Sequence, residues 1–170
     1  MSAEKQAKAS DKGLSDASAV DIKTPSIGTR KLATPTFVDT NILVYAFDRG
    51  SLERGAIARE IVGVLLESNL LRISTQVLLE FYVTVTRKIK APLSVEKAIE
   101  VIEDLELSPV YMIEPRAIRE AARLSQTAGL SYWDAMIVVA AAHSGVDRLF
   151  TEDLNHGQKI LDVQIINPFV

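Results

Sequence analysis

The chain has 170 residues, of which 48% are apolar and 24% charged, and its 19 basic and 22 acidic side chains give a net charge of −3, as in an ordinary soluble globular protein. The absence of cysteine excludes disulfides, thiolate zinc sites and thiol nucleophiles, so any catalysis would have to come from carboxylates, hydroxyls or the two histidines. No apolar run approaches the about 18 residues that span a bilayer, and the first residues lack the pattern of a secretory signal, so we expect a cytoplasmic protein without a membrane segment.

Residues 1–35 differ in composition from the rest of the chain. Lys, Ala, Ser and Asp dominate this segment, large apolar side chains are sparse, and no periodicity is visible. We therefore predict a disordered N-terminal tail over residues 1–35, followed by one domain over residues 36–170. The tail is weakly basic and could touch nucleic acid, although a solvated extension is the simpler interpretation.

From residue 36 onward, short apolar runs alternate with longer segments of helical periodicity. The strands are predicted at residues 36–38, 71–74, 110–113, 148–151 and 163–166. The helices are predicted at residues 42–47, 52–67, 76–89, 95–105, 115–129 and 132–144. Strands joined by helices predict an α/β fold: a three-layer α/β/α sandwich around a five-stranded, mainly parallel sheet.

Asp39 comes directly after the first predicted strand, which ends with Phe37 and Val38. In open parallel sheets, functional groups gather at the carboxyl ends of strands, where loops and helix starts meet. Asp39 is therefore a candidate site residue, although an Asp at this position could also simply cap a helix that begins at Asn41.

Glu80 lies in the predicted helix 76–89, where its neighbours are apolar nearly all round. Burying a carboxylate without a partner is unfavourable, so we expect either a metal ion or a basic side chain to meet Glu80. The positions three and four residues away carry no lysine or arginine, so a basic partner would have to come from elsewhere in the fold.

Asp134 and Asp153 also stand where the chain meets the predicted edge of the sheet. Asp134 opens an otherwise apolar helix, and Asp153 follows the strand at residues 148–151. Structural explanations exist for both, because Ser131 and Asp134 have the spacing of a capping box and an Asp after a strand suits a turn. Glu152 competes with Asp153 for any role at the site.

Right-handed crossovers in a parallel sheet would bring these four acidic residues to one edge. Carboxylates gathered in one place repel each other, and divalent cations that prefer oxygen ligands, Mg²⁺ or Mn²⁺, are the simplest compensation. Such a site supports hydrolysis of phosphodiesters, in which one ion activates a water molecule and a second, about 4 Å away, stabilises the leaving oxygen.

These segments resemble the PIN-domain nucleases in order and spacing. The resemblance rests on residues 37–41, 76–80, 131–135 and 149–154, and it covers about residues 36–170. Within that family, the small single-domain members are most similar, namely the VapC-type toxins of toxin–antitoxin pairs. The long N-terminal tail departs from the pattern of these small toxins.

The resemblance implies an endoribonuclease that depends on Mg²⁺ or Mn²⁺. Its acidic cluster would consist of Asp39, Glu80, Asp134 and Asp153. Asp39 and Asp134 would bind metal directly, while Glu80 and Asp153 would hold metal-bound water or a second ion. Asn41 and Thr151 would orient those carboxylates. The family also implies a homodimer and an antitoxin protein that inserts a segment into the active-site groove.

RNA phosphates require basic side chains near the acidic cluster, even in a chain that is acidic overall. Arg87, Lys88 and Lys90 close the helix that carries Glu80 and are the candidate substrate contacts, and Arg54 lies beyond the first helix. The same residues could instead be solvated helix ends that complement the helix dipole.

Two other functions compete with the nuclease. A catalytically silent PIN-like binding module would use the acidic residues for packing and partner recognition. A phosphatase or a receiver-type domain needs an adjacent acidic pair, or a second Asp two positions after the first, and the segment Asp39, Thr40, Asn41 provides neither.

Overall fold

The computed structural model describes residues 34–170, so the tail predicted for residues 1–35 lies almost entirely outside the described residues. The described residues form six strands and six helices, and the expected α/β fold is confirmed. The strands are β1 (Thr36–Val38), β2 (Leu71–Ser74), β3 (Val110–Tyr111), β4 (Arg148–Phe150), β5 (Lys159–Ile160) and β6 (Val163–Ile166). The helices are α1 (Thr40–Phe47), α2 (Leu52–Glu67), α3 (Thr75–Arg87), α4 (Val95–Leu105), α5 (Pro115–Ala128) and α6 (Tyr132–His143).

The strands form one sheet in the order β3-β2-β1-β4-β6-β5. All neighbouring pairs are parallel except β5 and β6, which are antiparallel. The central strand β1 pairs with β2 on one side and with β4 on the other. The carboxyl ends of β1, β2 and β4 therefore point to the same edge of the sheet.

The prediction of five strands is wrong by one, because β5 adds an antiparallel strand at the edge of the sheet. β5 turns into β6 through Leu161 and Asp162, whose φ angles are 49° and 63°. Two-residue hairpin loops with two positive φ angles favour Asn and Gly, so a Leu-Asp pair carries little turn signal. Two strand residues are also too few to display an alternating pattern.

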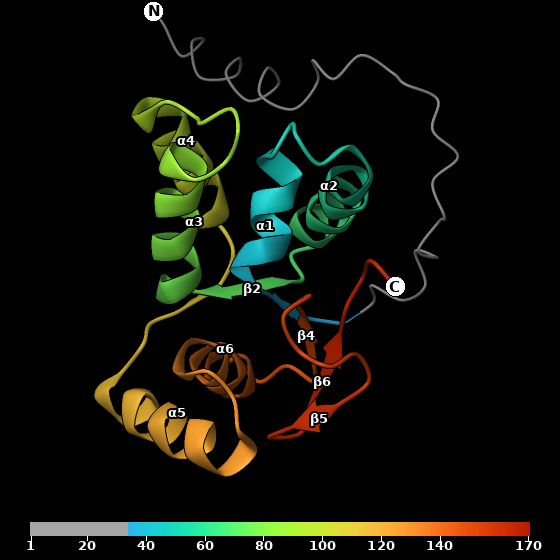
Figure 1. The fold of residues 1–170 in the computed structure, drawn as a ribbon. Helices are drawn as coiled ribbons and strands as arrows, with labels where there is room; N and C mark the ends of the chain where they lie inside the picture. The colour runs from blue at the N-terminus through green and yellow to red at the C-terminus, as the bar shows by residue number, and fades with distance from the viewer. Residues whose placement is uncertain (1–33) are drawn as a thin grey trace, which may run out of the picture.

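Helices cover both faces of the sheet and complete the three-layer arrangement. Figure 1 shows α1 to α4 on one side of the sheet and α5 with α6 on the other. The largest fully buried side chains come from the central strands and from the helix faces that meet them, and they include Phe37, Phe81, Ile42, Leu43, Ile61, Leu65, Leu71, Ile73, Leu149 and Ile165.

Helix α6 has an apolar surface on nearly every side, and residues 135–141 are all buried. It contacts β2, β4 and β6 and also packs along α5. A helix without a polar face is stable in water only when neighbours cover it, so this burial follows from the sequence of α6. None of the helices in residues 34–170 is long and apolar enough to cross a membrane.

Two helices begin directly at the carboxyl edge of the sheet. Asp39 N donates a hydrogen bond to Phe150 O (3.0 Å), which joins the end of β1 to the end of β4. Helix α1 begins at Thr40, two residues before the prediction, because the Asp39 carboxylate accepts a hydrogen bond from Thr40 N and caps the helix. Helix α3 starts directly after β2, with Ser74 as its cap.

Candidate functional site

The four predicted acidic residues line one cavity of about 310 Å³ at the carboxyl edge of the sheet. Asp39 comes from the end of β1, Glu80 from α3, Asp134 from the first turn of α6 and Asp153 from the loop after β4. The full lining is Asp39, Thr40, Asn41, Val44, Tyr45, Gln76, Glu80, Thr84, Trp133, Asp134, Ile137, Glu152 and Asp153. The topology thus brings acids from four segments to one hollow.

Asp39 is buried at the centre of a hydrogen-bond network. Its Oδ1 accepts from Thr40 N (2.6 Å), which caps α1. Its Oδ2 accepts from Thr151 Oγ1 (2.7 Å) and from Asn41 Nδ2 (3.1 Å). The carboxylate therefore caps a helix and faces the cavity at the same time, so the capping interpretation and the site interpretation do not exclude each other.

Burial raises the pKa of Asp39 to about 7. The hydrogen bonds from Thr151 and Thr40 lower this pKa, whereas the negative charges of Asp153 and Glu80 raise it further. All the groups that act on Asp39 are neutral donors or other acids. The buried carboxyl group thus lacks a compensating positive charge, which a cation in the cavity would supply.

Asn41 links three groups of the site through one side-chain nitrogen. Its Nδ2 donates to Asp39 Oδ2 (3.1 Å) and to Asp153 Oδ2 (2.9 Å), and it lies 3.1 Å from Thr151 Oγ1. Thr151 Oγ1 in turn accepts from Asp153 N (3.1 Å). Asn41 and Thr151 therefore hold the carboxylates of Asp39 and Asp153 beside each other.

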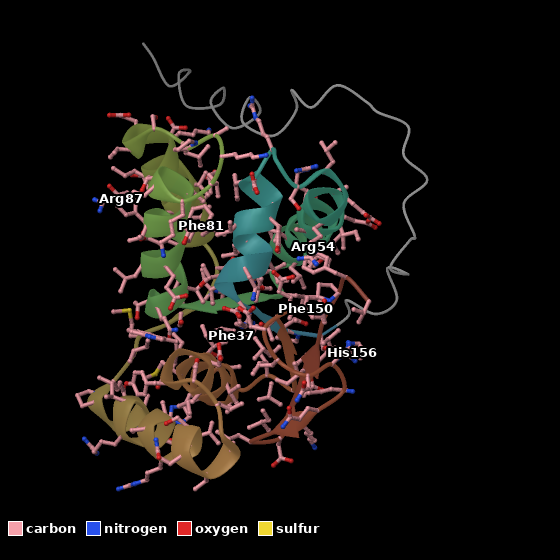
Figure 2. All side chains as sticks on the ribbon, in the orientation of Figure 1. Phe37, Arg54, Phe81, Arg87, Phe150 and His156 are labelled. Carbon is pink, nitrogen blue, oxygen red and sulfur yellow. The ribbon has the colours of Figure 1, made fainter. Side chains whose placement is uncertain are left out.

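Glu152 lies next to Asp153 in sequence but has different partners. Its Oε1 accepts from Tyr45 OH (2.5 Å), and its Oε2 pairs with Arg54 Nη1 (2.6 Å). The Arg54 guanidinium also lies over the rings of Tyr45 and Phe169, and Figure 2 shows it beside the C-terminal segment. Glu152 is thus engaged by a basic residue, whereas Asp153 is held by Asn41.

Glu80 is held by neutral donors on both of its oxygens. Thr40 Oγ1 donates to Oε2 (3.1 Å), and Gln76 Nε2 donates to Oε1 (2.9 Å). The expectation that Glu80 lies in a helix buried nearly all round is wrong, because Leu79 beside it is 70% exposed and Glu80 itself is only partly buried. Neither described partner of Glu80 is the lysine or arginine that a structural ion pair would require.

Asp134 lines the cavity but turns its carboxylate toward its own helix cap. Ser131 Oγ accepts from Asp134 N (3.1 Å) and donates to Asp134 Oδ2 (2.6 Å). The capping arrangement expected from the sequence is therefore present, with the carboxylate bound to the Ser131 hydroxyl instead of the Ser131 amide. Among the described residues, Asp134 therefore shares no side-chain hydrogen-bond donor with the other three acids.

The cavity lining offers a metal ion the oxygen atoms of carboxylates, hydroxyls and side-chain amides, which are the ligands that Mg²⁺ and Mn²⁺ prefer. Within residues 34–170, no three acidic or histidine side chains converge closely enough to enclose one ion. Mg²⁺ retains several waters and is commonly held by one or two carboxylates, so this spacing fits a hydrated cation. Asn41 Oδ1, which is buried without a partner, is a further oxygen at the site.

The predicted substrate contacts Arg87, Lys88 and Lys90 do not line the cavity. Arg87 lies seven residues after Glu80, which is roughly 10 Å farther along a helix. Figure 2 shows Arg87 on the outer side of α3, away from α1. The structure therefore does not bring these basic residues to the acids.

Two residues that line the cavity, Gln76 and Thr40, were not predicted from the sequence to be functional. Gln76 lines the cavity four residues before Glu80, a spacing that places both on one helix face and could have identified it. Thr40 binds Glu80 across 40 positions, and no local pattern predicts such a contact.

Comparisons with known proteins agree with this architecture. Residues 36–159 match the family described as PIN domain. The crystal structure of VapC20 from Mycobacterium tuberculosis, a toxin that cleaves the sarcin–ricin loop, matches at a TM-score of 0.52 and 18% identity, covering 67% of this chain and 86% of VapC20. VapBC2 from Rickettsia felis, bound to a DNA fragment from its promoter, matches at a TM-score of 0.55 and 18% identity, covering 76% of this chain and 96% of the other. Among curated proteins, none matches the sequence significantly.

Proposed function

Because the chain belongs to the PIN domain family, we propose that it is a divalent-cation-dependent endoribonuclease that hydrolyses RNA phosphodiester bonds. The observation that carries this proposal is that Asp39, Glu80, Asp134 and Asp153 line a single cavity. The described side chains that donate hydrogen bonds to these acids are neutral. A buried acid with a raised pKa beside two further carboxylates favours binding of a cation, and hard cations bind phosphates as well.

In this proposal, Asp39 and Asp134 bind the cation directly, and Glu80 and Asp153 hold its water molecules or a second ion. When bound, Mg²⁺ or Mn²⁺ supplies activation of water and stabilisation of the leaving oxygen. Asn41 and Thr151 keep Asp39 and Asp153 oriented toward the cavity through the hydrogen bonds described above.

We extend the proposal to the partners of the protein: it is the toxin of a toxin–antitoxin pair, is held by an antitoxin and forms a homodimer. The fold similarity to VapC20 and VapBC2 supports the toxin assignment. Protein contacts are supported by exposed large apolar side chains on two neighbouring helices, Leu79 and Val83 on α3 and Val95 and Ile99 on α4. Arg87, Lys88 and Lys90 would meet RNA phosphates outside the cavity, beyond the scissile bond.

The decisive experiment incubates the purified full chain with a panel of structured and single-stranded RNAs in Mn²⁺, in Mg²⁺ and in a chelator. We expect cleavage in either metal, none in the chelator, and none with Asp39→Asn or Asp134→Asn, each with an unchanged circular dichroism spectrum. Loss of those carboxylates without loss of cleavage would contradict the proposal, as would wild-type protein that cuts no RNA in Mn²⁺.

A catalytically silent PIN-like binding module is the second candidate. Two observations favour it: Asp134 is bound to Ser131, and no three described acids converge on one point. The two candidates differ in metal binding, because a ligand that binds only the folded state raises its melting temperature. A metal-free sample whose melting temperature does not rise in millimolar Mn²⁺ would favour the silent module.

A further inference from the structure

Gln76 is a buried polar residue to which the proposed chemistry assigns no role. Its side chain lies on α3, one turn before Glu80, and is only 5% exposed. Its amide nitrogen is 2.9 Å from Glu80 Oε1 and 3.3 Å from the backbone oxygen of Trp133. One buried amide therefore joins α3 to the first turn of α6.

The chemistry of these contacts determines how the amide is oriented. A carboxylate and a backbone carbonyl are acceptors only, so the NH₂ group of Gln76 must face both of them. The carbonyl oxygen Oε1 is consequently the free end, and it is buried without a hydrogen-bond partner. The opposite orientation would place this oxygen against two other oxygens.

The Gln76 amide connects the segments that carry two of the four acids. It binds one oxygen of Glu80, while Thr40 Oγ1 binds the other, so the carboxylate is fixed at both ends without being neutralised. It also binds the residue directly before Asp134. Gln76 therefore links the α3 segment that carries Glu80 directly to the α6 segment that carries Asp134.

The Gln76 amide carries a cost for folding at its oxygen end. An acceptor buried without a partner loses its hydrogen bonds to water and gains none in return. An apolar side chain of the same length would avoid the cost of this buried oxygen, but it would also leave Glu80 Oε1 and Trp133 O without their donor. A residue that buries an unpaired oxygen and at the same time holds a site carboxylate has the properties of a functional residue.

We propose that Gln76 is a positioning residue of the cation site, which fixes the Glu80 carboxylate and ties it to the start of α6 beside Asp134. This inference rests on the proposed metal-dependent function. It assigns Gln76 no direct contact with RNA, since the residue acts through Glu80.

The test compares Gln76→Met with Gln126→Met in the full chain; Gln126 lies on the exposed face of α5 and provides a matched control for the same chemical change. Mn²⁺ binding is measured by isothermal titration calorimetry without RNA, and the melting temperature is measured in a chelator. We expect about tenfold weaker Mn²⁺ binding for Gln76→Met, with a melting temperature in the chelator within about 4 °C of the wild type. Gln126→Met should bind Mn²⁺ as the wild type does.

A double-mutant cycle shows whether Gln76 acts through Glu80. In a Glu80→Gln background, Gln76→Met should cause no further loss of Mn²⁺ affinity. Gln76→Leu serves as a second apolar variant. If neither Gln76→Met nor Gln76→Leu folds, the inference is overturned, because the folded state then requires the amide. Additive losses in the cycle would overturn it as well.

The outcome separates the inference from the proposed function. Wild-type protein that binds Mn²⁺ and cleaves RNA, together with undiminished Mn²⁺ binding by Gln76→Met, would overturn the role of Gln76 alone. Wild-type protein that neither binds Mn²⁺ nor cleaves RNA would overturn the nuclease proposal, and the role of Gln76 with it.

Discussion

Asn41 and Asp153 are 112 positions apart in the chain, yet the Asn41 side chain donates a 2.9 Å hydrogen bond to the Asp153 carboxylate. The same nitrogen donates to Asp39. Two acids that would otherwise repel each other are thereby held at one donor, with Thr151 bound to Asp39 from the neighbouring strand end. This arrangement orients the carboxylates of Asp39 and Asp153, which follow β1 and β4, but leaves their negative charges uncompensated.

The first prediction concerns Asn41. Asn41→Ala should weaken Mn²⁺ binding and RNA cleavage by about 10-fold to 100-fold, because Asp39 and Asp153 lose a shared donor. The free energy of unfolding should fall by about 1 kcal/mol. Calorimetry, cleavage assays and urea denaturation measure these changes. Asn155→Ala, in an exposed part of the same loop as Asp153, is the control, and an equal loss there would refute the specific role of Asn41.

The second prediction concerns the two adjacent acids after β4. Asp153→Asn should lower the cleavage rate by about 100-fold, whereas Glu152→Gln should change it by no more than about threefold, because Arg54 and Tyr45 bind Glu152. Single-turnover cleavage in Mn²⁺ measures both variants. A larger loss for Glu152→Gln than for Asp153→Asn would mean that Glu152 is the functional acid of this loop.

The third prediction is a pH dependence of metal binding. Since the pKa of Asp39 is raised to about 7, protons compete with the cation for this carboxylate at neutral pH. The Mn²⁺ affinity should fall about tenfold per pH unit below pH 7 and level off above it. Calorimetric titrations between pH 5.5 and 8.5 (about three units, spanning this pKa) test this. An affinity that does not vary with pH would show that Asp39 does not bind the ion.

The fourth prediction concerns stability without metal. Burial raises the pKa of Asp39 to about 7 from the value of 3.8 expected of the exposed group. As the pH rises from about 4 to about 7, the unfolded chain releases this proton before the folded protein does. The free energy of unfolding therefore falls progressively over this interval and does not fall further above about pH 7. Urea denaturation in a chelator should show Asp39→Asn gaining stability over the wild type across this interval. A stability difference that stays constant with pH would contradict the raised pKa.

The fifth prediction concerns the basic end of α3. Replacing Lys88 and Lys90 by alanine should raise KM for RNA while leaving kcat within about twofold, because these residues lie outside the cavity. Each lost phosphate contact should also reduce the salt dependence of binding by a slope of about 1. Lys97→Ala, on α4 and paired with Glu100, is the control. Unchanged RNA binding and unchanged salt dependence in the double variant would show that Lys88 and Lys90 do not contact RNA.

The order of strands and helices and the α/β class could be predicted because both depend on local periodicity and on rules of chain connection that hold for most folds. The nearly all-apolar sequence of α6 predicted its burial for the same reason. β5 could not be predicted, because a two-residue strand closed by Leu161 and Asp162 carries neither an alternating pattern nor the usual turn residues.

Residue types alone also limited the chemistry: a chain without cysteine, with acids after its strands, can build an oxygen-donor site but not a thiolate one. Which acid meets which partner depended instead on contacts between distant segments. Arg54 binds Glu152 and leaves Asp153 to Asn41, and Thr40 binds Glu80. Hydrogen bonds and ion pairs act over only a few ångströms, so these pairings are determined where the folded elements meet and leave no local pattern in the chain.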